Sequence, residues 1–135
     1  MNTKTARSNR ACGLLSSVGV ASLALVLTGC GAVEAKCEQL INQTVEVVDG
    51  VKSVDAACSE SFGSSNASAG WVHLDADSEA EADEIIARIE EAMARNPEID
   101  SDWYGPARVS LNEGSSYIAS SSKTGVVRER LGIDP

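Results

Sequence analysis

The chain has 135 residues, of which 20 are acidic, 11 are basic and five are aromatic, and its formal net charge is −9. This length fits one small domain, and so few aromatic residues mean that its core is mostly aliphatic. The negative charge excludes nucleic-acid binding through phosphate contacts, and the sequence has no glycine-rich phosphate loop and no paired-cysteine metal motif.

The N-terminus has the three parts of an export signal. Lys4, Arg7 and Arg10 form a basic region, and an apolar run over residues 14–27 follows it. The run is too short and too rich in serine and glycine for a permanent transmembrane helix, so it indicates a secretory signal. It ends in Leu27-Thr28-Gly29-Cys30.

These four residues, placed directly after an apolar run, resemble the lipobox of bacterial lipoproteins. The resemblance implies that residues 1–29 are removed as a signal peptide and that Cys30 carries a diacylglycerol with palmitate-type acyl chains. Two acyl chains hold a protein stably at a membrane. The implied protein is anchored by its N-terminal lipid to the extracytoplasmic side of the bacterial cell membrane. The alternative is an ordinary signal peptide with an incidental cysteine.

The part that would remain after cleavage divides into a short tether over residues 30–34 and one small domain over residues 35–135. From Cys30 onward the chain keeps all 20 acidic residues and eight basic ones, a net charge of −12. Such a charge favours solubility and opposes binding of the domain itself to anionic lipid headgroups.

Cys37 and Cys58 are the two cysteines left for the domain. An even pair in an oxidising compartment favours a disulfide. Cys37 lies on the apolar stripe of a predicted helix, and Cys58 shares a predicted strand face with Val54 and Ala56, so both side chains point into the layer between helix and sheet. Two buried free thiols are the alternative.

Periodicity and end signals predict seven elements. The second helix is the clearest, because Ser78 and Glu81 form a capping box before a buried stripe that ends at Asn96-Pro97. In order we predict a helix over 34–49, a strand over 51–58, a long hairpin loop over 59–70, a strand over 71–75, a helix over 79–95, strands over 108–112 and 116–121, and a short helix over 124–131.

This order predicts an α+β fold, an αββαββ two-layer sandwich with a short C-terminal helix. Its simplest form is a four-stranded antiparallel sheet with two helices on one face. Moving the first strand of a ferredoxin-like unit to its end produces the same order of elements. That similarity is topological and implies no chemistry.

An acidic run after the third predicted element invites a calcium interpretation. Asp75, Asp77 and Glu79 match the first ligand spacings of an EF-hand loop, but Ala80 stands at the glycine position and Ile86 at the final carboxylate position. The run suits the N-terminus of a helix better. We therefore predict neither a metal site nor any other cofactor.

Trp71, His73 and Asp75 alternate onto one strand face and form a candidate binding surface. The alternative is an ordinary half-exposed strand. Trp103 and Tyr104 form a second aromatic cluster, suited either to an interface or to closing one end of a small core. His73 is also the only histidine available for a Ser-His-Asp catalytic triad. The sequence contains no Gly-x-Ser-x-Gly motif, which often carries the nucleophile of such a triad.

The leading hypothesis is a non-enzymatic, membrane-anchored envelope lipoprotein that binds another envelope protein or a cell-wall component. The second is a binder of a small ligand or a cation on the acidic side of the sheet. The third is a hydrolase of envelope polymers. An open sheet face bearing Trp71 and His73 favours the first, whereas a closed pocket with converging carboxylates favours the others.

Overall fold

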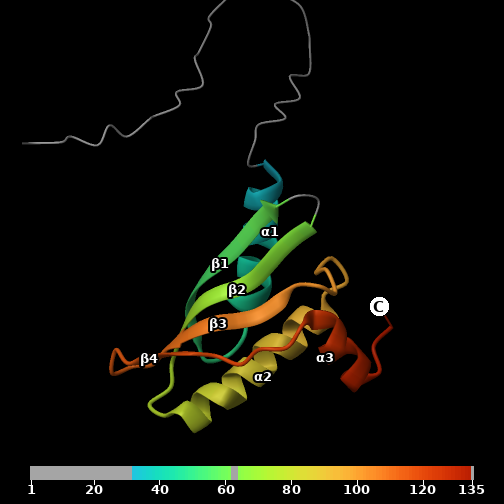
Figure 1. Ribbon diagram of the computed structural model, residues 1–135. Helices are drawn as coiled ribbons and strands as arrows, with labels where there is room; N and C mark the ends of the chain where they lie inside the picture. The colour runs from blue at the N-terminus through green and yellow to red at the C-terminus, as the bar shows by residue number, and fades with distance from the viewer. Residues whose placement is uncertain (1–31, 62–63, 135) are drawn as a thin grey trace, which may run out of the picture.

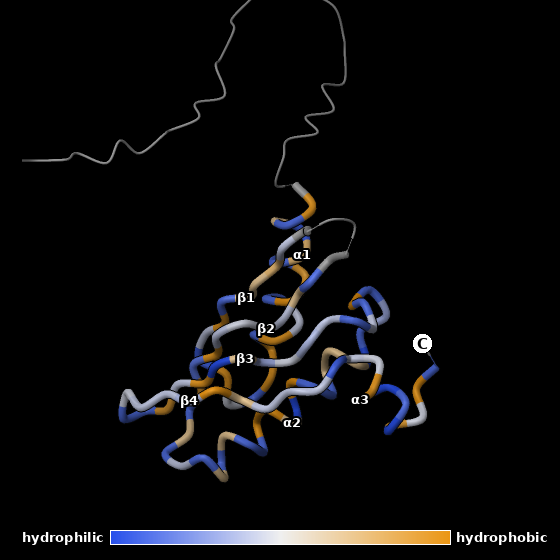
Figure 2. The backbone as a smooth tube through the Cα atoms, viewed as in Figure 1, coloured by the Kyte–Doolittle hydropathy of each residue, from blue (hydrophilic) through white to orange (hydrophobic). Residues whose placement is uncertain are grey.

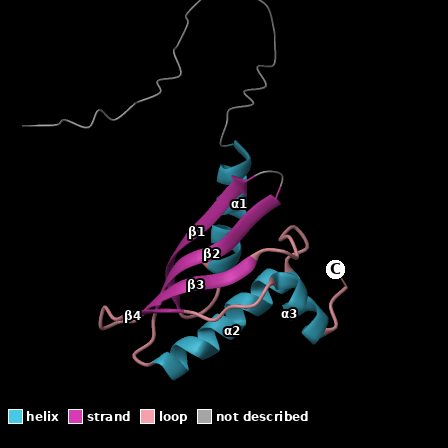
Figure 3. Cartoon of the chain, viewed as in Figure 1, coloured by secondary structure: helices cyan, strands magenta, loops and turns pink. Residues whose placement is uncertain are grey.

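The computed structural model describes residues 32–61 and 64–134 (Figure 1). The predicted signal peptide, the lipobox, Cys30 and most of the tether lie outside the described residues. The elements follow the predicted order of types (Figure 3): α1 (Ala32–Val45), β1 (Val51–Ser61), β2 (Ser64–Leu74), α2 (Glu79–Arg95), β3 (Tyr104–Ser110), β4 (Ser116–Ile118) and α3 (Thr124–Leu131).

Two helices begin and end at their predicted residues, α2 and α3. At the start of α2 the Ser78 hydroxyl accepts a hydrogen bond from the Glu81 N–H at 3.3 Å. The Glu81 carboxylate accepts from the Asp77 N–H at 2.8 Å, one residue before the position that a full capping box uses. α1 is displaced toward the N-terminus, because it begins at Ala32 and ends at Val45 instead of spanning 34–49.

The predicted hairpin loop over 59–70 is wrong. β1 and β2 are 11 residues long each and pair antiparallel from Val51↔Leu74 to Ser61↔Ser64. Serine, asparagine and alanine are poor strand formers, but pairing with a neighbouring strand supplies the hydrogen bonds that their propensity does not predict. The polar segment therefore becomes strand in both arms of the hairpin.

The sheet order is β1-β2-β3-β4, and the prediction of an antiparallel sheet is also wrong for its central pair. β2 and β3 are parallel, whereas the other two pairs are antiparallel. α2 connects β2 to β3 as a crossover, which is the connection that adjacent parallel strands need. A ferredoxin-like sheet places a third strand between two such strands, so this mixed sheet departs from that arrangement.

One face of the sheet forms the core with α1 and α2. Val54, Val72 and Val109 are cross-strand neighbours, and all three are buried. They pack in one cluster with aliphatic residues of both helices: Ile41, Val45, Ile85, Ile89 and Met93. Hydrophobic and hydrophilic residues alternate along α1 and α2 (Figure 2), because only one stripe of each helix is buried. The described residues thus form a two-layer sandwich, and none of their helices packs on the other sheet face.

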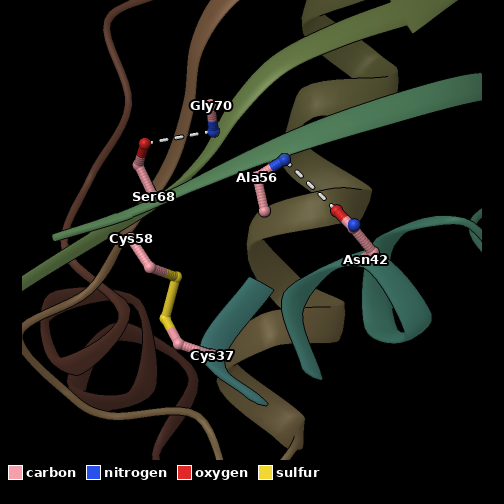
Figure 4. The surroundings of a disulfide bond; sticks show 6 residues. All are labelled: Cys37, Asn42, Ala56, Cys58, Ser68 and Gly70. Carbon is pink, nitrogen blue, oxygen red and sulfur yellow. Dashed lines mark hydrogen bonds between the residues drawn. A yellow bond between two sulfur atoms is a disulfide. The ribbon is translucent and has the colours of Figure 1, made fainter. Parts of the chain in front are cut away.

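A disulfide joins Cys37 of α1 to Cys58 of β1, as predicted, with 6.2 Å between the Cα atoms (Figure 4). The same helix makes a second tie to the same strand, because the Asn42 side-chain oxygen accepts from the Ala56 N–H at 3.2 Å. The strand register shifts between Asp55 and Ala57, so Ala56 lies at a bulge. α1 is therefore held to the edge strand by one covalent bond and one hydrogen bond.

Gly70 is part of that bulge, because Ala69 and Gly70 of β2 together lie opposite Ala56, and Gly70 has a φ of +62°. Its N–H donates to the Ser68 hydroxyl at 3.0 Å, and a Cβ at this position would lie 2.1 Å from the Asp55 carbonyl oxygen. The bulge shifts the alternation of β2 by one position, so the outward-facing residues are Ser68 before it and Trp71 and His73 after it. The bulge that shapes the open face therefore requires glycine at position 70.

We expect Gly70→Ala to lower the free energy of unfolding by about 1–3 kcal/mol more than Gly114→Ala does. Gly114 also has a positive φ, of +82°, but a Cβ there would meet nothing within 4 Å. Both variants carry the backbone strain, and only the first carries the collision. Urea unfolding followed by circular dichroism measures the difference, and equal losses would show that the close approach at Gly70 relaxes without cost.

Candidate binding surface

The open face of the sheet carries Trp71 and His73 side by side. Their rings stack with centroids 5.3 Å apart and an interplanar angle of 21°. The Trp71 indole N–H donates to the Ser110 hydroxyl at 2.7 Å, and Arg108 lies over the indole at 5.2 Å. These contacts fix the indole on the sheet while 39 % of Trp71 stays exposed.

A hollow of about 830 Å³ lies on the sheet close to this pair. Its floor consists mainly of alanine and serine from β1, β2, β3 and the segment that follows β4, and Tyr104 and Ile118 are its largest side chains. Small side chains on neighbouring strands leave the space that these two residues border. The lining residues that matter here are Ala57, Ser68, Tyr104, Ala107, Ile118 and Ser120.

The two residues of the predicted aromatic cluster separate. Tyr104 lines the hollow and is 40 % exposed, whereas Trp103 packs against the core beside the disulfide. The Trp103 indole nitrogen is buried without a hydrogen-bond partner in the described part of the chain. Trp103 therefore helps to close one end of the core, whereas Tyr104 stays on the surface as a candidate binding residue.

Lys123 completes the surroundings of Tyr104. Its ammonium lies 5.6 Å from the Tyr104 ring and 3.1 Å from a carboxylate oxygen of Asp102. The hydrogen bond to Asp102 and the attraction of its charge raise the pKa of Lys123 above the ordinary value. The cation is thus paired locally at this end of the face.

Asp75 makes its polar contacts at the end of β2 and not with the Trp71 and His73 rings. It follows the end of β2, where its carboxylate accepts from the Asn112 amide at 3.1 Å and lies 3.7 Å from the Lys52 ammonium. The same Asn112 amide donates to Asp77 at 2.8 Å. The Asp75 and Asp77 carboxylates therefore both accept hydrogen bonds from the Asn112 amide, which lies between them where a cation would have to bind.

The prediction that the acidic run binds no calcium tightly follows from this arrangement as well as from the incomplete EF-hand pattern. Within residues 32–61 and 64–134, no three histidine, cysteine or acidic side chains converge as a metal site requires. Calorimetry with calcium chloride is expected to give no stoichiometric heat in the micromolar range. Stoichiometric uptake that Asp77→Ala abolishes would contradict the prediction.

Arg108, Ser110 and Ile118 are parts of this face that the sequence did not single out. Ile118 is the most exposed of them, at 80 %. Arg108 and Ser110 lie two residues apart in a predicted strand, so strand alternation could have placed them on one face, as it did for Trp71 and His73. Ile118 gave no such signal, because its strand has only three residues.

The described residues contain no helix long and apolar enough to cross a membrane. Comparison of the chain with protein-family models, with curated proteins and with solved structures found no match.

Proposed function

We propose that this chain is a bacterial lipoprotein, anchored through a lipid on Cys30, whose domain binds another envelope protein or a cell-wall component without catalysing a reaction. The observation that carries the proposal is the open sheet face, which gathers Trp71, Tyr104 and Ile118, three of the seven large hydrophobic residues that are exposed in the described part of the chain and the two aromatic ones among them. Exposed aromatic and large aliphatic residues gathered on one face are typical of binding surfaces.

The anchor and the disulfide support the cellular location. Leu27-Thr28-Gly29-Cys30 stands where a lipoprotein carries its modified cysteine, and a disulfide suits an oxidising compartment outside the cytoplasm. α1 begins at Ala32, two residues after Cys30, so the tether reaches only about 7 Å. The start of α1 lies at the same end of the domain as the end of β1 and the start of β2 (Figure 1), which is the end that would stand nearest the membrane.

The surroundings of His73 favour binding over hydrolysis. Its ring stacks on Trp71, and among the described residues no carboxylate forms a hydrogen bond with it. A nucleophile–base–acid arrangement needs such a contact to orient the base. The acidic side of the sheet supports the cation-binding alternative less well, because the Asn112 amide already engages its carboxylates.

The binding part is tested by photo-crosslinking in the native membrane. A photoreactive phenylalanine analogue at position 118 samples the open face, and the same residue at position 126 of α3, where Val126 is 54 % exposed, serves as the matched control. We expect a discrete crosslinked species from position 118 and none from position 126. Identical patterns, or none from either site, would remove the open face from the proposal.

The anchor is tested by mass spectrometry of the membrane fraction. We expect the mature N-terminal peptide to begin at Cys30 and to carry the mass of a diacylglyceryl group, because two acyl chains make the attachment stable. Cys30→Ala should abolish this species. A Cys30→Ala protein that is cleaved before residue 30 and remains in the membrane would contradict lipid anchoring while leaving the binding face open to its own test.

A further inference from the structure

We infer that the hollow on the open sheet face binds a short stretch of an uncharged glycan. The inference rests on the proposed function and names the chemistry of the partner at the same face. Three independent features of the described residues carry it: the lining of the hollow, the exposed aromatic rings beside it and the balance of charge around it.

The lining combines hydroxyl and methyl groups. Ser59 of β1, Ser68 of β2, and Ser120 and Ser121 after β4 supply hydroxyl groups, and alanines of the same segments lie between them. A sugar ring has the matching composition, with hydroxyl groups around its rim and C–H groups on its faces. A volume of about 830 Å³ lies within the range of small-ligand clefts.

Exposed aromatic rings flank the hollow. Tyr104 forms part of its wall, and the stacked Trp71–His73 pair lies on the adjacent part of the same sheet face. Flat aromatic faces pack against the C–H face of a sugar while a polar edge stays wet. Two such platforms along one face suit neighbouring rings of a single glycan chain.

The charge of this face differs from that of the domain. Among the described residues that line the hollow, Glu38 of α1 is the one charged side chain. Asp55 and Arg108 flank Trp71 on the neighbouring strands, and Lys123 near Tyr104 is paired with Asp102. A nearly neutral face on a domain of charge −12 is complementary to an uncharged ligand, and the surrounding field repels an anionic polymer.

Other occupants fit the same features less well. An acyl chain would cover the serine hydroxyls without replacing their hydrogen bonds to water, which is costly. A cation would need converging carboxylates, and the lining supplies one. A protein partner remains an outcome that the experiments distinguish.

The test is an NMR titration of the isotope-labelled, full-length, lipid-anchored protein in detergent micelles. The uncharged probes are chitotetraose and cellotetraose, the anionic probe is tetragalacturonate, and lauric acid represents an acyl chain. We expect the uncharged probes to shift the resonances of Ser68, Ala107 and the Trp71 indole with a Kd on the order of 1 mM. The indole of Trp103, buried on the other side of the sheet, should not move.

Variants separate ring stacking from general disturbance of the face. Tyr104→Ala should raise the Kd roughly tenfold, and Tyr104→Phe should stay within about twofold because the ring is kept. Val126→Ala on α3 is the matched surface control and should change nothing. Equal losses from Tyr104→Ala and Tyr104→Phe would overturn the stacking role.

The remaining outcomes decide between partners. No shift of the hollow by either uncharged tetrasaccharide at about 10 mM, or a response only to tetragalacturonate or lauric acid, would overturn the inference. If position 118 still crosslinks to a discrete protein in the membrane, the proposed binding function stands and only the glycan is excluded. If position 118 crosslinks nothing and the tetrasaccharides do not bind, both fail together.

Discussion

Replacing Arg128 with alanine is expected to lower the free energy of unfolding by about 3–4 kcal/mol, because several buried acceptors lose their donor at once. Arg128 of α3 is 5 % exposed. Its guanidinium donates to the carbonyl oxygens of Ala94 at 2.9 Å, Asn96 at 2.7 Å and Ile99 at 2.7 Å. It therefore satisfies the C-terminal end of α2 and the turn after it, where a cation also complements the helix dipole.

The matched control for Arg128 is Arg130 in the same helix. Arg130 lies 3.7 Å from the Glu90 carboxylate, and its side chain is 60 % exposed, so Arg130→Ala should cost less than about 1 kcal/mol. Arg128→Lys should fall between the two, since an ammonium keeps the charge but not the planar fork of donors. Urea unfolding of the three variants measures the order, and equal losses at positions 128 and 130 would show that the buried contacts contribute nothing particular.

Removing the disulfide is the second change with a large expected effect. The bond closes a loop with a sequence separation of 21 residues, and the chain-entropy model assigns such a loop roughly 3 kcal/mol. That is a large share of the stability of a domain this small. We expect Cys37→Ser with Cys58→Ser to shift the urea midpoint downward by the corresponding amount, and reductant to do the same to the wild type.

Asn42→Ala supplies the comparison, because it removes the other tie between α1 and β1 and leaves the disulfide intact. Losing one partly buried hydrogen bond should cost about 1 kcal/mol. If the two ties hold the same helix, the disulfide variant and Asn42→Ala together should differ from the sum of their separate effects. A wild-type protein whose midpoint does not respond to reductant would contradict a stabilising role of the bond.

The rest of the fold determines which face of the sheet is left open. α1 and α2 cover one side of the sheet and bury its valines, and on the other side the described residues place no helix. In the lipid-anchored protein proposed above, the short stretch between Cys30 and α1 would hold the domain close to the membrane. Such a position suits contact with a polymer or a protein that lies along the envelope.

The sequence by itself determined the features that depend on a few neighbouring residues or on a residue pair. The Ser78 cap, the buried stripe and Asn96-Pro97 define α2 within one or two helical turns, and the structure has the same limits. Cys37 and Cys58 were placed in one layer by periodicity, and the bond is present. Alternation put Trp71 and His73 on a common face, and the rings stack there.

Tertiary structure decided the features that depend on partners far along the chain. Ser64–Leu74 becomes a long strand because β1 and β3 supply its hydrogen bonds, and no local propensity encodes that pairing. The parallel alignment of β2 with β3 depends on where α2 returns the chain. Asp75 is hydrogen-bonded to Asn112, which lies 37 residues away in the sequence.

The hollow and the burial of Arg128 are the features that the sequence was least able to predict. The hollow exists because small residues from β1, β2, β3 and the segment after β4 are brought side by side, and no one of these segments predicts it alone. From its place near the end of a short helix, Arg128 would be expected at the surface. It is buried because the carbonyl groups of Ala94, Asn96 and Ile99 lie against its guanidinium. Local sequence determines which segments form helices and carry strand alternation, whereas burial and pairing depend on contacts that exist only once those segments have packed.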